Sequence, residues 1–173
     1  LYIAISKTTS PAIVKKWQAA LDEMKAGSTF LTISRKWLPE ACLPEAVFQP
    51  SKEWDKGPKI IIYTENSPPG NYVDQKGRLQ GPAVHVVEEV LQRLGSSATI
   101  EVVPWARGYH LAQTQPNVAL FATSRLPQRE KLFKWVGPLY TQRWGFYKKK
   151  GAAIRVQTLD DAKTVGRIGT YHE

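Results

Sequence analysis

KIIIYTENSPPGNYVDQKGRLQGPAVHVVEEVLQRLG, residues 59–95, contains two hydrophobic patterns in succession. The run at 59–63 is short and apolar, as in a buried strand, whereas residues 81–95 carry apolar side chains at helical spacing up to a final Gly95. ATIEVV at 98–103 then predicts another strand. A strand, a helix and a strand in this order are typical of parallel strands joined by a covering helix. The stretch therefore predicts an α/β fold.

The same alternation continues toward the end of the chain. Residues 104–114 predict a helix that begins after a proline, and NVALFAT at 117–123 predicts a strand. TLDDAK at 158–163 predicts a short helix capped by its threonine. RWGFYKKK at 143–150 and TVGRIGTY at 164–171 predict two more strands, which would begin a second sheet.

The beginning of the chain predicts a pair of helices. In the first, 10–26, Ser10 can cap the helix and Pro11 occupies its first position. The second, 28–38, has aromatic and apolar residues at helical spacing. The following residues, up to 58, contain four prolines and no periodicity, and so predict an irregular connector.

Composition and charge exclude several classes of protein. The chain of 173 residues has a formal net charge of +9, but its basic residues are spread along the sequence, which argues against a nucleic-acid partner. No apolar run is long enough to span a bilayer, and no signal segment is recognisable. Cys42 is the only cysteine, and the histidines, His85, His110 and His172, have no metal-ligand or nucleophile spacing. We therefore expect no metal, no cofactor and no catalytic activity.

A series of segments resembles a known family. YTENSPPGNYVDQKGRLQGPAVHVVEEVLQRLG, VPWARGYHLAQ, NVALFATSRLPQREKLFKWVGPLY and LDDAKTVGRIGTY occur in the order and spacing of the amino-terminal half of the bacterial extracellular solute-binding proteins of family 3. The resemblance covers residues 58–173 and rests on the series rather than on one motif. It implies a periplasmic-binding-protein type II lobe, in which helices flank a parallel or mixed sheet.

The opening residues, LYIAISKTTSPAIVKKWQAALDEMKAGSTFLTISRKWLP, resemble the carboxyl-terminal segment of the same family: a hinge strand, a long helix and a short helix. In that family one lobe contains both chain ends. We therefore expect residues 1–40 and 58–143 to form the first lobe, 41–57 to connect them, and 144–173 to begin an incomplete second lobe. A junction between tandem binding modules and an engineered permutation would both give this order; the proline-rich connector favours the junction.

Candidate ligand-binding residues follow from sheet topology and from the resemblance. An open α/β sheet binds ligands beyond the carboxyl ends of its strands, where Glu65 and the Ala122–Ser124 segment would lie. The resemblance implies that Arg129 clamps a ligand carboxylate and that Trp105 stacks on the ligand. It also makes candidates of Tyr72, Arg167 and Thr170. Many members of the family lack an arginine at the position of Arg125, which either reinforces the anion site or is simply solvated.

The function that the resemblance implies is a receptor for a small polar solute, amino-acid-like or carboxylate-bearing. Its partner would be the membrane permease of an ABC transporter, and its location periplasmic or otherwise extracytoplasmic. An extracytoplasmic sensor module is the alternative, and a hydrolase or other enzyme is less favoured. Because a partial second lobe exposes apolar faces, we also expect an intertwined homodimer, or fraying toward the end of the chain.

Overall fold

The computed structural model of the protein describes residues 1–37, 59–141 and 145–169. The chain divides into two compact units, Leu1–Thr141 and Gln142–Glu173. The predictions for Cys42, Thr170, His172 and the 41–57 connector lie outside the described residues.

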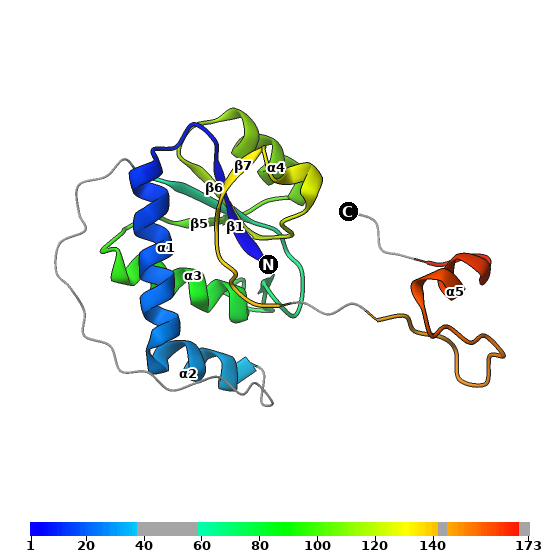
Figure 1. Cartoon of the computed structure of the whole chain (residues 1–173). Coiled ribbons are helices and arrows are strands. Elements are labelled where there is room, and N and C mark those ends of the chain that lie inside the picture. The colour runs from blue at the N-terminus through cyan, green and yellow to red at the C-terminus, as the bar shows by residue number, and fades with distance from the viewer. Residues whose placement is uncertain (38–58, 142–144, 170–173) are drawn as a thin grey trace. The chain divides into compact units, whose positions relative to one another are not determined.

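The first unit is built on a mixed five-stranded sheet (Figure 1). Its order is β5 (Ile100–Val102), β2 (Ile61–Thr64), β6 (Val118–Thr123), β1 (Tyr2–Ser6) and β7 (Phe133–Val136). β2 pairs in parallel with both β5 and β6, as the alternation of strands and helices predicted. β1 runs antiparallel to β6 and β7. The predicted fold class, an α/β lobe with a parallel or mixed sheet, is confirmed.

Alternate strand residues face two different layers of helices. Ile3, Ile5, Ile62 and Phe121 join the larger core, which is shared with α1 (Pro11–Ala26), α2 (Ser28–Trp37) and α3 (Pro82–Arg93). Their neighbours in sequence, among them Ala4, Tyr63 and Leu120, join the smaller core under α4 (Trp105–Thr114). This period of two is what a sheet covered on both faces requires.

The helices begin where the sequence predicted. The Ser10 hydroxyl accepts a hydrogen bond from the Ala12 amide at 3.3 Å, and Pro11 opens α1. α3 follows Gly81, whose φ of 124° favours glycine; a Cβ there would lie 2.3 Å from the Gly70 carbonyl oxygen. A small hairpin that the sequence did not predict, β3 (Tyr72–Val73) and β4 (Leu79–Gln80), leads into this turn.

Residues 1–37 contact residues 59–141 through side-chain hydrogen bonds as well as through the hydrophobic core. The Gln18 side chain accepts from the Gly137 amide at 2.9 Å and donates to the Gly137 carbonyl at 3.3 Å. The Arg93 guanidinium donates to the Thr29 hydroxyl at 3.1 Å, which joins α2 to α3. The structure therefore places both opening helices on this unit.

The second unit differs from its prediction. The short helix is present as α5 (Leu159–Thr164), with Thr158 and Asp161 forming a capping box. The strands predicted at 143–150 and 164–171 are wrong for the described part, since residues 145–169 contain turns and α5 but no strand. A strand gains its hydrogen bonds from a neighbour, and no described residue of this unit supplies one.

Candidate functional site

The carboxyl ends of two parallel strands bring the first candidates to one edge of the sheet. β2 and β6 are paired directly, with Ile61 opposite Val118 and Tyr63 opposite Leu120. Glu65, which follows β2, and Ser124, which follows β6, therefore leave the sheet at the same edge. Both side chains are half-buried.

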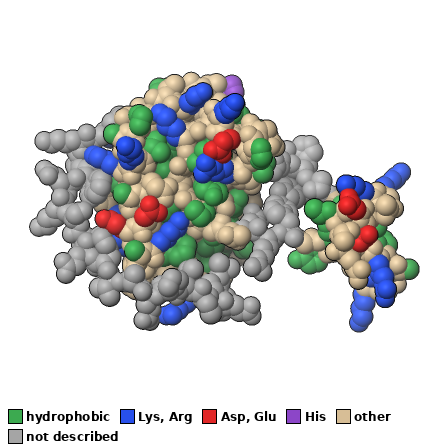
Figure 2. All heavy atoms as spheres, in the orientation of Figure 1, with side chains coloured by type: hydrophobic (Ala, Val, Ile, Leu, Met, Phe, Trp, Pro, Cys, Tyr) green, Lys and Arg blue, Asp and Glu red, His purple; other side chains and the backbone are tan. Residues whose placement is uncertain are grey.

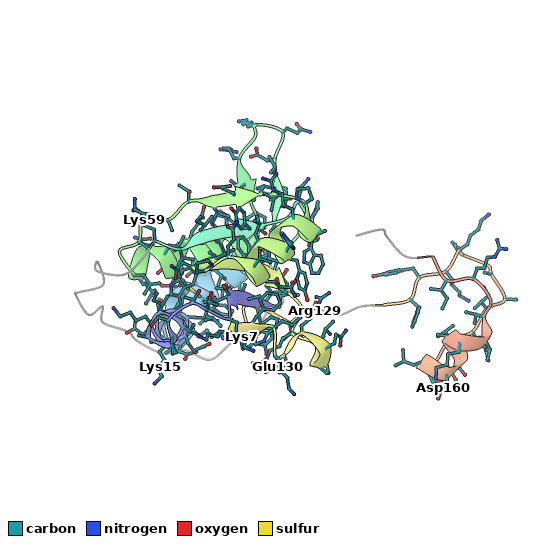
Figure 3. All side chains as sticks on the ribbon, turned by 90° about the horizontal axis from the view of Figure 1, so that it is seen from above. Lys7, Lys15, Lys59, Arg129, Glu130 and Asp160 are labelled. Carbon is teal, nitrogen blue, oxygen red and sulfur yellow. The ribbon has the colours of Figure 1, made fainter. Side chains whose placement is uncertain are left out.

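Arg129 lies in a short 3₁₀ turn (Pro127–Arg129) beyond this edge. Its guanidinium carbon lies 4.7 Å from the centre of the Trp105 ring and 5.3 Å from that of Tyr109. Nη1 also lies 3.5 Å from the Ser124 carbonyl oxygen, at the limit of a hydrogen bond. Figure 3 shows Arg129 and Glu130 projecting from this loop. The structure thus brings together three predicted site residues, Arg129, Trp105 and Ser124.

The two rings beneath Arg129 form a platform on α4. Trp105 and Tyr109 are four residues apart on the helix and stack with centroids 4.6 Å apart. A guanidinium that lies on an aromatic face keeps its N–H donors in its own plane, where they can meet a carboxylate. Gly108 allows α4 to approach the sheet, because a Cβ there would lie 2.9 Å from Leu120 Cδ1. Tyr109 was not predicted as a site residue from the sequence. Its position four residues after Trp105 in a predicted helix was the signal that could have identified it.

Arg125, the second predicted arginine, is engaged in an ion pair. Its Nε and Nη2 donate to the two carboxylate oxygens of Glu130, at 2.8 and 2.5 Å. The hydrogen bonds from Arg125 hold the pKa of Glu130 below its ordinary value, and the same bonds raise the pKa of Arg125. Both side chains are substantially exposed, so solvent screens this attraction.

Ala122 occupies an irregular point of β6. Its φ is 60°, in the left-handed region that non-glycine residues rarely adopt. The pairing of β1 with β6 shifts register here, from Tyr2 opposite Thr123 to Ala4 opposite Leu120. This bulge turns the chain at the end of β6 before the loop that carries Arg129.

A buried asparagine fixes the end of β2. Asn71 Nδ2 donates to the Thr64 hydroxyl at 3.0 Å and to the Glu65 carbonyl at 2.8 Å. The side chain is 1% exposed, so these bonds replace its contacts with water. Asn71 was not predicted from the sequence as a residue that shapes the site. The only signal for it was its position directly after Pro-Pro-Gly, where the chain turns.

Tyr72 lies in a different group of rings. Its ring packs edge-on against Trp37 of α2 at 6.5 Å, and Trp37 also contacts His85 at 5.5 Å. Among the described contacts, none joins Tyr72 to Arg129. The other two predicted residues belong to the second unit: Arg167 is exposed there, and Thr170 is not described.

Metal-binding clusters, membrane-spanning helices and the distribution of basic side chains can be assessed for the described ranges. Residues 1–37, 59–141 and 145–169 hold no cluster of three or more His, Cys, Asp or Glu side chains that could bind a metal ion. The helices within those ranges are also too short or too polar to cross a membrane. Figure 2 shows Lys and Arg side chains dispersed over the visible face rather than gathered in one stripe.

Comparison with known proteins gives one match. The model of the bacterial extracellular solute-binding proteins, family 3, matches residues 60–164. The matched range contains β2, α3, β5, α4, β6, the Arg129 loop, β7 and α5. No curated protein and no solved structure matches the chain.

Proposed function

The chain belongs to the bacterial extracellular solute-binding proteins, family 3, and from this premise we propose that it binds a small carboxylate-bearing solute, amino-acid-like in size and polarity. We further propose that it acts outside the cytoplasm and delivers the solute to the permease of an ABC transporter. The family match supports the binding role. The arrangement around Arg129 supports the ligand class.

One observation carries the proposal: Arg129 is a half-buried cation placed on two stacked rings at the carboxyl edge of the sheet. Its neighbouring acid, Glu130, is bound to Arg125 instead. Arg129 therefore keeps its charge for a ligand, and its planar fork suits a carboxylate. The platform of Trp105 and Tyr109 adds an apolar surface for the rest of the solute.

Residues 1–37 lie outside the matched range. Their packing on residues 59–141 supports the proposal that they supply the second part of the same lobe, as the resemblance implied. Bounds of 1–40 and 58–143 for the lobe stay predictions, as do the ligand roles of Glu65, Tyr72, Arg167 and Thr170.

The ligand class is tested by screening the standard L-amino acids and short dicarboxylic acids for a rise in Tm of the full chain, followed by calorimetry of the compounds that bind. Arg129→Ala should weaken binding by about 2–4 kcal/mol, roughly 30-fold to 1000-fold, because it removes a charge-assisted contact. Lys131→Ala is the matched control: it removes the same charge from an exposed position two residues away.

An unchanged affinity in Arg129→Ala, for a compound that the parent chain binds, would show that Arg129 does not hold the ligand. Failure of every carboxylate in the screen, alongside binding of an uncharged or cationic solute, would overturn the ligand class. An equal loss in Lys131→Ala would mean that the net charge, rather than Arg129, attracts the ligand.

A further inference from the structure

The loop that carries Arg129 is a short turn with few internal hydrogen bonds. The Arg129 amide donates to the Leu126 carbonyl at 2.9 Å, and the Arg129 carbonyl accepts from Leu132 at 3.0 Å. Most side chains between Arg125 and Leu132 are exposed, so little packing fixes the turn. Additional contacts are needed to hold a long arginine side chain in one place, because its rotamer freedom is large.

Those contacts converge on Glu130, directly after Arg129. Its carboxylate receives both hydrogen bonds from Arg125, on the opposite side of the turn. Its backbone oxygen accepts from Trp135 Nε1 at 3.3 Å, which ties the loop to β7. Its amide lies 3.4 Å from the Pro127 carbonyl oxygen within the turn. Arg125 and Glu130 therefore close the loop around Arg129.

Arg125 is itself oriented by rings. Its guanidinium carbon lies 5.5 Å from the centre of the Tyr2 ring and 5.9 Å from that of Trp135. These rings meet edge to face at 6.1 Å. From Trp135 the row of rings continues through Phe133, at 5.5 Å, to Tyr109, at 5.2 Å. The two arginines thus lie on one continuous row of aromatic side chains that spans β1, β7 and α4.

We propose that Arg125 and Glu130 are positioning residues that hold Arg129 over Trp105 and Tyr109, and that Arg125 is not a second ligand for the anion. The proposal rests on the proposed role of Arg129. Two donors of Arg125 are occupied by Glu130, whose carboxylate is the counter-charge of this arginine. The sequence left two interpretations open for Arg125, a ligand of the anion or a solvated side chain, and neither of them includes the ion pair with Glu130.

The two roles predict opposite outcomes when the charges are removed one at a time. Arg125→Ala removes a positive charge and Glu130→Gln removes a negative one, so a direct or long-range electrostatic effect on an anion would differ in sign between them. A positioning effect has the same sign in both, because each variant opens the same bidentate pair. Lys131→Ala again serves as the control for charge in this loop.

The measurement is the Nε–Hε resonance of Arg129 in the ligand-free full chain, by NMR, with acetate as the anion probe. Because the guanidinium carbon lies 4.7 and 5.3 Å from the centres of Trp105 and Tyr109, the ring currents should shift this proton away from the position of a solvated arginine. We expect Arg125→Ala and Glu130→Gln to move it toward the solvated position, and both to weaken its response to acetate. Lys131→Ala should leave the resonance in place. Tm should change little, because the pair is exposed.

An unmoved Arg129 resonance in Arg125→Ala and Glu130→Gln would overturn the proposal, as would weaker acetate binding in the first and stronger binding in the second. If Arg125→Ala does not fold, Glu130→Gln by itself tests the proposal, because it only replaces a carboxylate oxygen by an amide nitrogen at an exposed position. A parent chain in which acetate leaves Arg129 unaffected would contradict the carboxylate role of Arg129, while the ligand-free resonance would still test its positioning.

Discussion

At Ala122 the backbone adopts a conformation that costs an L-residue free energy. Its φ of 60° places the Cβ close to the following carbonyl, a strain of roughly 1–2 kcal/mol. The residue stands at the bulge in β6, two positions before Ser124, whose carbonyl approaches Arg129. Such strain persists where surrounding structure enforces it, and here the pairing of β6 with β1 and β2 does so.

We therefore expect Ala122→Gly to stabilise the protein. Relief of the left-handed strain outweighs the entropy that glycine adds to the unfolded chain, about 0.5–1 kcal/mol, so the free energy of unfolding should rise slightly. Ala119→Gly is the control, because Ala119 is fully buried in the same strand; it should lower that free energy. Urea denaturation of both variants measures the difference. A loss of stability in Ala122→Gly would show that the conformation carries no strain.

Single residues also show the limits of sequence reasoning. Arg129 and Trp105 could be predicted from their place in a series of segments, and the structure brings them together. The pairing of Arg125 with Glu130 could not, because a charged residue in a loop gives no indication of which neighbour it faces. The role of Asn71 depends on a fold-back onto Thr64 that only tertiary structure reveals.

Among the elements, the amphipathic helices and the apolar strands β2, β5 and β6 were predictable, whereas β3, β4 and β7 were not. α1 and α3 each begin with a proline and carry apolar residues at helical spacing, so two independent signals agree. β7 was not predicted, because Lys134 interrupts the apolar residues of FKWV and the strand forms by pairing with β1 from the start of the chain. The strand predicted at 143–150 fails for a related reason: propensity alone does not form a strand without a paired neighbour.

α5 provides a prediction about pH. The Asp161 carboxylate accepts from the backbone amides of Gln157 and Thr158, both at 2.9 Å, and these bonds hold its pKa below the ordinary value. A lowered folded-state pKa means that the stabilisation is complete above the unfolded-state value and is lost as pH falls through the folded-state value. The helix should therefore remain until pH falls below the ordinary pKa of aspartate, and then fray.

The helical chemical shifts of Leu159–Thr164 during an acid titration measure this effect. Asp161→Ala should weaken α5 already at neutral pH and remove most of the pH dependence. Asp160→Ala is the control, because Asp160 bonds to Lys163 on the exposed side and takes no part in the capping box. Helical shifts that persist throughout the titration of the parent chain would show that the box contributes little.

At the scale of the whole molecule, the two units differ in how much apolar surface they bury. The first has two cores on opposite faces of its sheet. In the described part of the second, Ala162 is the buried apolar residue, while Phe146, Tyr147, Ile154, Leu159 and Ile168 are exposed. Isolated exposed apolar residues are common, but five within one short unit leave it little to stabilise its own fold.

The final prediction concerns this second unit in the full chain. In dilute solution its amides should exchange with solvent much faster than those of β6, because local opening there exposes almost no additional apolar surface.

If copies of the chain cover one another's exposed side chains, as the expected intertwined dimer would require, protection of α5 and the mass from light scattering should rise together with concentration. Phe146→Ser with Tyr147→Ser, two exposed positions, should prevent both increases. Strong protection of α5 in a chain that stays monomeric at every concentration would contradict both the local instability and the dimer, because the unit would then be stabilised within a single copy.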